Sequence, residues 1–514
     1  MAKLKQPDRP DTAGRKRGTS LPIAGQGEGP DRAAPRSKRT PKPASIKPPV
    51  VSFVSLGCAK NLVDSEKMLG QLVESGAIIS GDEAAADTIV VNTCGFLENS
   101  RTEALEILQE LAGRKRAGKL RRIVVAGCLV QRDGEKIKEW VPEVDALVGV
   151  NNRDDVVRAV WRMDRDAATE LFLGEYHPQH WDDRGRLRLT PRHYAYLRIS
   201  EGCNQKCTFC TIPSIRGPMH SKSPDELVAE GNELIADGVR ELILIGQDTT
   251  SYGEDIAAHG GLAGLVRTLN EGCSEATWIR LMYVYPTAMT DAIIDALAQS
   301  ERFVKYIDMP LQHINDRMLR AMGRRIDRSA TEVLLDKLRR RIPGVTIRTT
   351  FIVGFPGETE TEFAELERFV RDFGFDAAGA FMYSYEAETP SARIADPIND
   401  SLKRERHQRL MLAQQEVAYA RAKSRIGQRF EVLVDGAAGS PMTGGENGAD
   451  AIGADGNSRK GTVARHSGQA PDVDSVCLLS GGRHKPGQMV NVNVVEASGY
   501  DLIVRPVHAA LTLK

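Results

Sequence analysis

The chain has 514 residues, of which 41% are hydrophobic and 27% charged, and its 69 basic and 69 acidic residues cancel to a net charge of zero. This length is enough for two or three domains, each with its own core. Zero net charge excludes binding to nucleic acid through bulk charge alone. No apolar run approaches the roughly 18 residues of a membrane span, and the N-terminus lacks the apolar core of a signal peptide. We therefore expect a cytoplasmic, monomeric protein without membrane contact.

The eight cysteines of the chain are the first pointer to its chemistry. Disulfides are rare in a reducing cytoplasm, so cysteines that gather in motifs are better interpreted as metal ligands or catalytic groups. Cys273 and Cys477 lie outside any motif, and we expect them to be ordinary packed thiols. The other six form two sets of three.

Residues 1–48 form a tail that differs from the rest of the chain. They are rich in proline, glycine and basic residues, and twelve lysines and arginines against four acids give them a charge of about +8. Such a segment buries too little apolar surface to fold, and we predict that it is disordered. We interpret it as a solubilising extension, with a weak arm for ribosomal RNA as the alternative.

Residues 49–160 alternate short strands with helices. The Val/Ile-rich runs are "VVSFVSLGC", "DTIVVNTCG", "RRIVVAGC" and "VDALVGV", and helix-like segments such as "DSEKMLGQLVESG" lie between them. This alternation predicts a doubly wound parallel α/β sheet. Residues 161–188 are polar and are expected to be a linker.

A second alternation fills residues 189–426. Six strand-like runs, from "HYAYLRISEG" to "DAAGAFMYSYE", are each followed by a helical stretch, the last running from about Ser401 to Arg425. Six β/α units predict a partial (β/α)6 barrel, open on one side, with functional groups at the carboxyl ends of its strands. Residues 427–514 show strand-like runs between glycine-rich turns, which predicts a small antiparallel β-barrel with a long surface loop at about 436–460.

The strongest chemical signal is "EGCNQKCTFC", directly after the first strand of the six-unit domain. It places Cys203, Cys207 and Cys210, here called the loop set, on one loop. Three thiolates in this spacing can bind three irons of a 4Fe-4S cube and leave the fourth iron for another ligand. The alternative is a zinc site, which would need a fourth ligand such as His193 or His220.

The other three cysteines, Cys58, Cys94 and Cys128, are here called the dispersed set. Each ends an apolar strand, in "SLGC", "VNTC" and "VAGC". The carboxyl ends of strands in a doubly wound sheet open onto one crevice, so these thiols should converge. One such cysteine would be interpreted as packing, but three at matching positions, each beside a glycine and with no histidine in the domain to act as a base, favour a second cluster with an open iron.

The loop set at the head of six β/α units resembles the radical S-adenosylmethionine superfamily, in which S-adenosylmethionine binds the open iron and is cleaved by one electron to a 5′-deoxyadenosyl radical. The stretches "ILIGQDTTSYG" and "TFIVGFPGET" resemble its cofactor-contacting loops. The cofactor contacts that the resemblance implies are Phe209, Gly246, Gln247, Asp248, Gly354 and Gly357. Turn formation is the alternative role of the three glycines.

Taken as a whole, the chain after the tail resembles the methylthiotransferases, which insert a methylthio group into an unactivated C–H bond of RNA or protein. The resemblance implies two 4Fe-4S clusters and two uses of S-adenosylmethionine. One molecule methylates sulfide held at the dispersed set, and another supplies the radical at the loop set. Because homolysis replaces deprotonation, we nominate no acid–base residue as catalytic. We expect the electron to come from a flavodoxin- or ferredoxin-type donor.

The substrate is suggested by "GCAKNLVDSE", which resembles the branch that modifies an aspartate β-carbon of ribosomal protein S-12; the branch acting on transfer RNA adenosine usually has Gly-Cys-Gln-Met-Asn here. The C-terminal barrel resembles a TRAM domain. The barrel region has 8 basic and 9 acidic residues and two aromatic residues, Phe430 and Tyr500. This composition suits binding to a basic ribosomal protein, and with it the ribosome, better than binding to RNA. The alternative is that the barrel only caps the core. A transfer RNA enzyme and a two-cluster electron carrier remain open alternatives.

Overall fold

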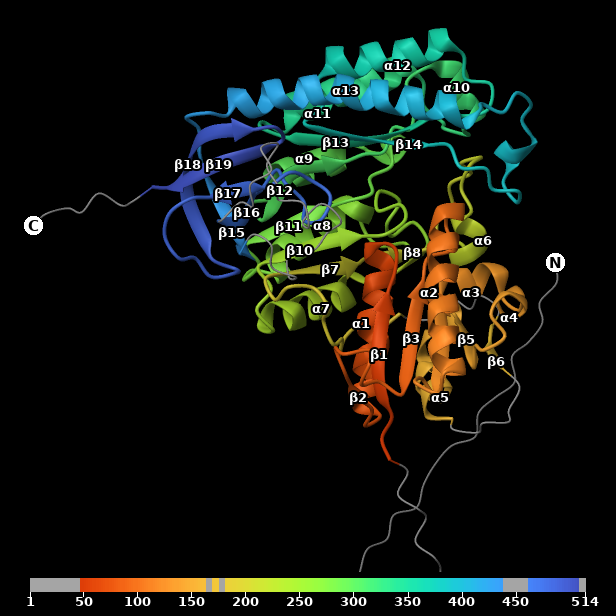
Figure 1. Ribbon diagram of the computed structural model, residues 1–514. Coiled ribbons are helices and arrows are strands. Elements are labelled where there is room, and N and C mark those ends of the chain that lie inside the picture. Colours follow the sequence, from red (N-terminus) through yellow and green to blue (C-terminus); the bar gives the residue numbers. More distant parts are fainter. Residues whose placement is uncertain (1–46, 163–168, 175–180, 438–460, 508–514) are drawn as a thin grey trace, which may run out of the picture. The chain divides into compact units, whose positions relative to one another are not determined.

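The computed structural model describes residues 47–162, 169–174, 181–437 and 461–507 (Figure 1). The described residues from Pro48 onward form one compact unit. The tail predicted for residues 1–48 lies outside the described residues up to residue 46, as does the predicted surface loop from residue 438. Within the described ranges, no helix is both long and apolar enough to cross a membrane.

The first sheet is parallel throughout, with the strand order β2-β1-β3-β4-β5-β6. Its strands are β1 Val50–Ser55, β2 Ile78–Ile79, β3 Thr88–Thr93, β4 Arg122–Gly127, β5 Ala146–Gly149 and β6 Glu170–Phe172. Its helices are α1 Ala59–Glu74, α2 Glu98–Arg116, α3 Cys128–Asp133, α4 Lys136–Trp140, η1 Val150–Asp155 and α5 Val156–Trp161. One face of the sheet packs on α2 and the other on α1 and α5, which confirms the doubly wound prediction.

Two strands of this sheet were missed by the sequence pattern. β2 has two residues and β6 has three, which is too short for a recognisable apolar alternation. β6 pairs with β5 and lies inside the segment expected to be a linker, so part of that segment completes the first sheet.

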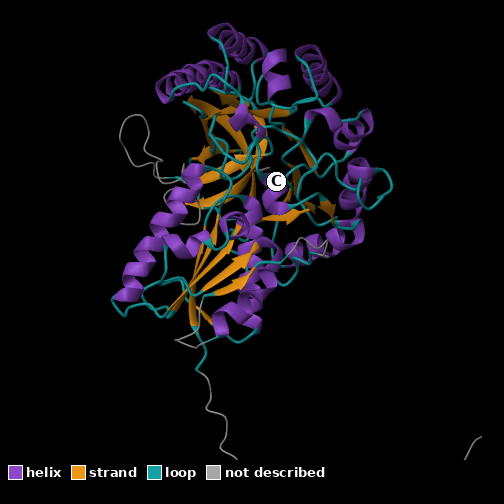
Figure 2. Ribbon diagram, turned by 90° about the vertical axis from the view of Figure 1, so that its right-hand side faces the viewer, coloured by secondary structure: helices purple, strands orange, loops and turns teal. Residues whose placement is uncertain are grey.

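The second sheet is also parallel, in the order β14-β13-β12-β11-β10-β7, so that β7 and β14 are its two edges. All six predicted strands are present: β7 Tyr194–Arg198, β10 Glu241–Ile245, β11 Trp278–Leu281, β12 Phe303–Asp308, β13 Thr346–Val353 and β14 Ala377–Met382. Figure 2 shows helices outside the strands, as the partial barrel requires. They are α6 Ile212–Arg216, α7 Pro224–Ala236, α8 Gly261–Gly272, η2 Pro286–Ala288, α9 Asp291–Gln299, α10 Asp316–Ala321, α11 Arg328–Arg341, α12 Glu360–Phe373, η3 Pro390–Arg393 and α13 Asp400–Ser424.

Local sequence sets where several of these helices begin. Ser223 and Glu226 form a capping box at the start of α7, and Thr359 and Glu362 form another at the start of α12. Each box satisfies two backbone groups that a helix start leaves free. A short antiparallel pair, β8 Ser200–Glu201 with β9 His220–Ser221, follows β7 and brackets the loop set.

The C-terminal strands close into a barrel in the order β15-β16-β17-β19-β18. They are β15 Arg429–Ala437, β16 Thr462–His466, β17 Cys477–Leu479, β18 Met489–Ser498 and β19 Asp501–Pro506. The pairs are antiparallel, as predicted, except for β17 with β19. Arg465 of the barrel pairs with Glu241 at the first residue of β10, with 2.7 Å between nitrogen and oxygen. The barrel therefore packs at the amino ends of the sheet strands, whereas the loop set follows their carboxyl ends.

Candidate active site: two sets of cysteines

The dispersed set gathers at one edge of the first sheet, as predicted. Cys58 follows β1, Cys94 follows β3, and Cys128 directly follows β4. These three strands are neighbours, and the register aligns Thr93 with Gly127. Cys58 is exposed, Cys94 half-buried and Cys128 buried, so the set runs from the surface inward.

Glycines let the three cysteine turns approach one another. A Cβ on Gly57 would lie 2.8 Å from the Cβ of Cys94, and a Cβ on Gly95 would lie 2.7 Å from the Cys128 carbonyl oxygen. Gly127 has a φ of +96° and would place its Cβ 2.2 Å from Asn92 Oδ1. Real side chains do not fit at such distances, so each turn packs against the next only because glycine stands there.

The electrostatics of the dispersed set suit a metal cluster. The pKa of Cys128 is raised to about 12, mainly by burial; Arg216 opposes this shift, and the Cys58 and Cys94 thiolates contribute to it. Burial also raises the pKa of Cys94, and Cys58 adds to that shift. Sulfurs that perturb one another in this way are close together, and bound iron would supply the positive charge that favours three thiolates. The donor set therefore fits the expected cluster.

Asn61 joins the dispersed set to its surroundings. Its Nδ2 donates to the carbonyls of Leu56 (3.0 Å) and Thr93 (2.8 Å), which precede two of the cysteines. Its Oδ1 accepts from an Arg216 NH group at 2.5 Å and from the Cys128 thiol at 3.4 Å. The Asn61 side chain thus contacts Cys128 itself and a residue just before each of the other two cysteines.

The loop set is held by the short β8–β9 pair and by α10. The Cys203 NH donates to the Gly217 carbonyl (3.2 Å), and the Thr208 NH donates to the Met322 carbonyl (3.0 Å). Gly202 has a φ of +78°, and a Cβ there would lie 2.2 Å from the Pro218 carbonyl oxygen. The three cysteines are half-buried, so the loop is fixed while its sulfurs keep one side accessible.

The thiols of the loop set also affect one another. Burial raises the pKa of Cys203 to about 11 and that of Cys210 to about 12, and Cys207 adds to both shifts. Burial, followed by the neighbouring Cys207, raises the pKa of Tyr285 to about 12. This donor set, like the first, fits a cluster bound by three thiolates.

The structure removes His193 as a fourth ligand of the zinc alternative. His193 precedes β7, at the strand end opposite the loop set, and its Nε2 lies 2.8 Å from Asp435 of the barrel. His220 faces Asp255, with 3.5 Å between nitrogen and oxygen. Among the described residues, no three His, Cys, Asp or Glu side chains are arranged to hold a single metal ion. A cube instead takes each thiolate on a different iron.

Each cysteine set receives one arginine that the sequence did not single out. Arg216, the buried last residue of α6, donates to Cys128 Sγ through Nε (3.3 Å) and an NH2 nitrogen (3.1 Å). Arg324, which follows α10, donates to Cys207 Sγ at 3.6 Å and lies 4.1 Å over the Tyr285 ring. Both arginines are isolated in sequence from the cysteines that they contact, so no motif indicated them.

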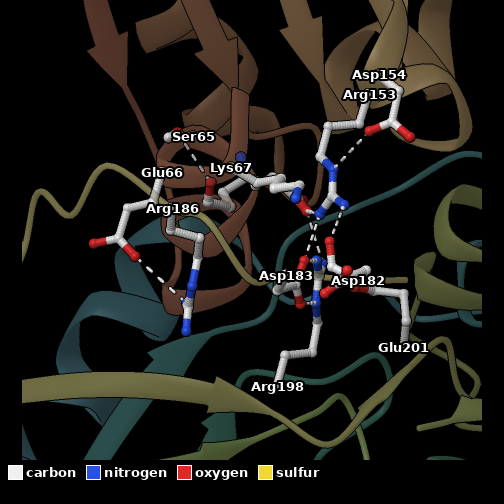
Figure 3. Close-up of polar contacts among 12 residues, drawn as sticks. Ser65, Glu66, Lys67, Arg153, Asp154, Asp182, Asp183, Arg186, Arg198 and Glu201 are labelled. Atoms are coloured by element: carbon white, nitrogen blue, oxygen red, sulfur yellow. Dashed lines mark hydrogen bonds and ion pairs between the residues drawn. The ribbon is translucent and has the colours of Figure 1, made fainter. Parts of the chain in front are cut away.

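Arg216 belongs to a buried ion network that joins the first sheet to the second. It pairs with Glu201 (3.0 Å) and Asp64 (3.1 Å), and Arg198 pairs with the same two carboxylates. In Figure 3, Arg153 and Arg198 converge on Asp183, each at 2.7 Å. Buried ion pairs give little net stability but fix geometry strongly, because breaking one leaves an uncompensated charge. The network therefore fixes where Cys128 lies relative to Glu201, two residues before Cys203.

The two cysteine sets adjoin each other. Thr211 follows the last cysteine of the loop set, and its hydroxyl donates to the Phe96 carbonyl, two residues beyond Cys94, at 3.4 Å. Arg216 bridges from the same segment to Cys128. A molecule bound at one set would therefore lie beside the other.

Lys60 is a further residue at this junction. It is the second residue of α1 and is 7% exposed. Its Nζ lies 3.1 Å from the centroid of the Tyr283 ring. A cation–π contact of this kind contributes about 0.5–2 kcal/mol. Among the described residues, no carboxylate pairs with this ammonium.

The residues predicted to contact S-adenosylmethionine near β10 lie beside the loop set. Asp248 is buried and accepts from the side chain of Gln205, a residue of the cysteine loop, at 2.8 Å. Gln247 donates to Glu201. A Cβ on Gly246 would lie 2.7 Å from Ser200 Oγ, so this glycine has a packing role of its own.

The remaining predicted contacts are Phe209, within the loop set, and two glycines after β13. Phe209 packs with Met318, Met322 and Phe355 in a small apolar cluster. Gly354 and Gly357 have φ values of +71° and +76°, and Gly354 lies against Lys403, so turn formation accounts for both. A role in cofactor binding stays a prediction for all six residues.

Comparison with known proteins gives a consistent result. A model of the Radical SAM superfamily matches residues 197–370, one of Uncharacterized protein family UPF0004 matches residues 50–149, and one of the TRAM domain matches residues 450–507. Among solved structures, the radical S-adenosylmethionine methyltransferase TsrM from Kitasatospora setae is similar with a TM-score of 0.49 at 15% identity, covering 66% of this chain and 74% of that one.

Curated relatives match almost from end to end. "Ribosomal protein uS12 methylthiotransferase RimO" of Anaeromyxobacter sp. (strain K) is 43% identical over 454 residues, which is 88% of this chain and 92% of that protein. The protein of the same name from Trichlorobacter lovleyi is 40% identical over 453 residues, which is 88% of this chain and 97% of that protein. The chain therefore belongs to the RimO family of radical S-adenosylmethionine methylthiotransferases.

Proposed function

We propose that this chain inserts a methylthio group at the β-carbon of an aspartate of ribosomal protein uS12, with S-adenosylmethionine as cosubstrate. Relatives of this name at 43% and 40% identity support the substrate. The observation that carries the proposal is the junction of the two cysteine sets, where Arg216 contacts Cys128 and Thr211 contacts Phe96. Generation of a radical needs one set, and a second set beside it suits delivery of sulfur to the radical carbon.

The cofactors are two 4Fe-4S clusters and S-adenosylmethionine, in keeping with the family. When bound, they supply the sulfur, the methyl group and the hydrogen-abstracting radical. The dispersed set would hold one cluster and the loop set the other. Arg216 and Arg324 donate hydrogen bonds to one cysteine sulfur in each set, which orients those ligands and withdraws charge from them.

Buried ion pairs of Arg216 also hold the two cysteine sets in a fixed position relative to each other. Glu201 and Asp64 both bind Arg216, so the start of the cysteine loop, the start of α1 and Cys128 share one buried cation. Transfer between two sites requires reacting atoms within about 3–3.5 Å. A rigid link of this kind limits how far the sites separate during transfer.

The partners beyond the substrate follow from the reaction. Cleavage of S-adenosylmethionine consumes one electron, and a flavodoxin- or ferredoxin-type protein is the proposed donor. We also propose that the enzyme acts in the cytoplasm, in contact with the ribosome or with free uS12. We propose that it acts as a monomer, because the described part of one chain contains both cysteine sets.

The test is mass spectrometry of two substrates after anaerobic reconstitution with iron and sulfide. Holoenzyme, S-adenosylmethionine and a one-electron reductant should add one methylthio group to uS12, and a deletion strain should lack that group on its ribosomal protein. In parallel, transfer RNA from the same strain is digested and its methylthioadenosine measured. Loss of methylthioadenosine with unchanged uS12 would sink the proposal in favour of the transfer RNA reaction.

A further inference from the structure

Lys60 differs from the other buried cations of the structure. Arg198, Arg216, Lys222 and the remaining lysines and arginines below 9% exposure each have a hydrogen bond or ion pair to an oxygen atom. Among the described residues, Lys60 contacts only the face of the Tyr283 ring through its ammonium group. The Lys60 side chain is mostly buried, and its ammonium group has three N–H donors without a carboxylate partner among the described residues.

The position of Lys60 indicates what kind of group could pair with its ammonium. Lys60 comes two residues after Cys58 of the dispersed set. Tyr283 lies on the loop after β11, two residues before Tyr285, which neighbours Cys207 of the loop set. The contact between Lys60 and Tyr283 therefore links the segments that carry the two cysteine sets.

The backbone holds this pair in an unusual way. Tyr283 has a φ of +61°, a left-handed conformation that costs energy for a residue with a large side chain. The Tyr283 NH donates to Asp308 (3.1 Å), and its carbonyl accepts from the Thr249 hydroxyl (3.1 Å). Strain held in place by the surrounding structure is typical of ligand-binding positions.

We propose that Lys60 binds the side-chain carboxylate of the substrate aspartate. This inference rests on the proposed function and adds to it the group that recognises the substrate. The carboxyl carbon of the aspartate is bonded directly to its β-carbon. N–H donation from Lys60 to the carboxylate oxygens would therefore hold the carboxyl group in place, and with it the reacting C–H bond on the next carbon. A charge-assisted hydrogen bond is also stronger and shorter than a neutral one.

The same contact would select against other substrates. An adenine ring carries no anionic group to pair with the ammonium, and asparagine presents a neutral amide. A bound substrate of either kind would cover the ammonium without supplying an anion, and a site discriminates strongly between similar groups in this way. The role of Lys60 is thus positioning and specificity, with no proton or covalent bond exchanged.

One other carboxylate could reach this ammonium, namely the methionyl carboxylate of S-adenosylmethionine. The two sources differ in a measurable way. If Lys60 bound the cosubstrate, replacing it would raise the KM for S-adenosylmethionine in reductive cleavage without uS12. If Lys60 binds the aspartate, that reaction is unchanged and only the steps with uS12 suffer.

The experiment tests two enzymes against two substrates. Each enzyme is an anaerobic holoenzyme whose iron content is checked. Wild-type enzyme and Lys60→Met are each given uS12 and a uS12 variant with asparagine in place of the modified aspartate. We measure the Kd of each protein and the yield of 5′-deoxyadenosine and modified product. Lys67→Met, on the same helix, is the control, since Lys67 donates to the Arg184 carbonyl away from the junction.

We expect wild-type and Lys67→Met enzyme to bind the aspartate substrate about 10- to 100-fold more tightly than the asparagine variant. Lys60→Met should bind both alike, with substrate-free cleavage of S-adenosylmethionine at the wild-type level. Equal binding of the two substrates by wild-type enzyme overturns the inference even if Lys60→Met fails to fold. A raised KM for S-adenosylmethionine without uS12 overturns it in favour of the cosubstrate. A wild-type enzyme that modifies neither substrate overturns the proposed function, and this inference with it.

Discussion

The loop set and the dispersed set reach similar chemistry by opposite routes. The loop set lies within residues 203–210, and its backbone is held by a two-residue strand pair and one helix. The dispersed set draws on three strand ends between residues 58 and 128. A local motif tolerates changes elsewhere in the fold, whereas an assembled one depends on every contact that keeps its strand ends in register.

The glycines show this dependence most directly. Gly57 and Gly95 touch the turns of neighbouring cysteines, and Gly127 lies against Asn92 of the adjacent strand. The dispersed set therefore has its spacing fixed by packing between segments that are far apart in sequence. The loop set has most of its spacing fixed by the chain itself.

The largest expected effect comes from removing each set in turn. Replacing Cys58, Cys94 and Cys128 by Ala should leave about four irons per chain and intact cleavage of S-adenosylmethionine, with methylthio transfer lost. Replacing the loop set should also leave about four irons but abolish cleavage. Iron quantitation and 5′-deoxyadenosine assays check both. Iron that stays near the wild-type content after the first change would show that the dispersed set is not a cluster site.

Arg216→Met should have the next largest effect. It removes the cation shared by Cys128, Glu201 and Asp64, and breaking a buried pair costs about 3–5 kcal/mol. We expect the lower end, about 3 kcal/mol, because Arg198 still pairs with both carboxylates. Urea unfolding measures the loss of stability, and the electron paramagnetic resonance signal of the dispersed-set cluster should shift. An unchanged signal would contradict the proposed role of Arg216 as a hydrogen-bond donor to the dispersed set.

Gly127→Ala tests close packing together with a backbone conformation that essentially only glycine adopts, since Gly127 has a φ of +96° and a ψ of −154°. Both Gly127 and Gly118 have positive φ, but a Cβ at Gly118 would meet nothing within 4 Å. Gly118→Ala should therefore cost only the conformational penalty of about 1–2 kcal/mol, and Gly127→Ala about 1 kcal/mol more from overpacking. Thermal unfolding of both variants gives the difference. Equal costs would mean that the strand ends do not need to approach as closely as the structure indicates.

Arg324→Met should have the smallest effect and sharpens the contrast with Arg216. Among the described contacts, Arg324 donates to a carbonyl and a thiol and stacks on Tyr285, so its removal leaves no carboxylate unpaired. We expect a loss of about 1–2 kcal/mol from the lost cation–π and hydrogen-bond contacts, measured by urea unfolding. A loss as large as that of Arg216→Met would contradict the view that unpaired carboxylates set the cost.

Much of the fold could be predicted because the apolar patterns were strong. All six strands of the second sheet and four strands of the first were predicted from Val/Ile-rich runs, and the family comparison agrees with the domain types. β2 and β6 were missed because two or three residues show no period. The predicted domain limits stay predictions.

The sequence by itself determined the cysteine spacing, the strand positions and the family, since these depend on short-range pattern. The sequence alone indicated no physical role for Lys60, Asn61 or Arg216. The tertiary structure decided those roles, because a buried amide or cation acquires its meaning from partners that lie far away along the chain. Asn61 contacts Thr93 and Cys128, Arg216 contacts Asp64, and Lys60 faces Tyr283. Such contacts leave no local signal, because each residue alone has an ordinary place in its own helix.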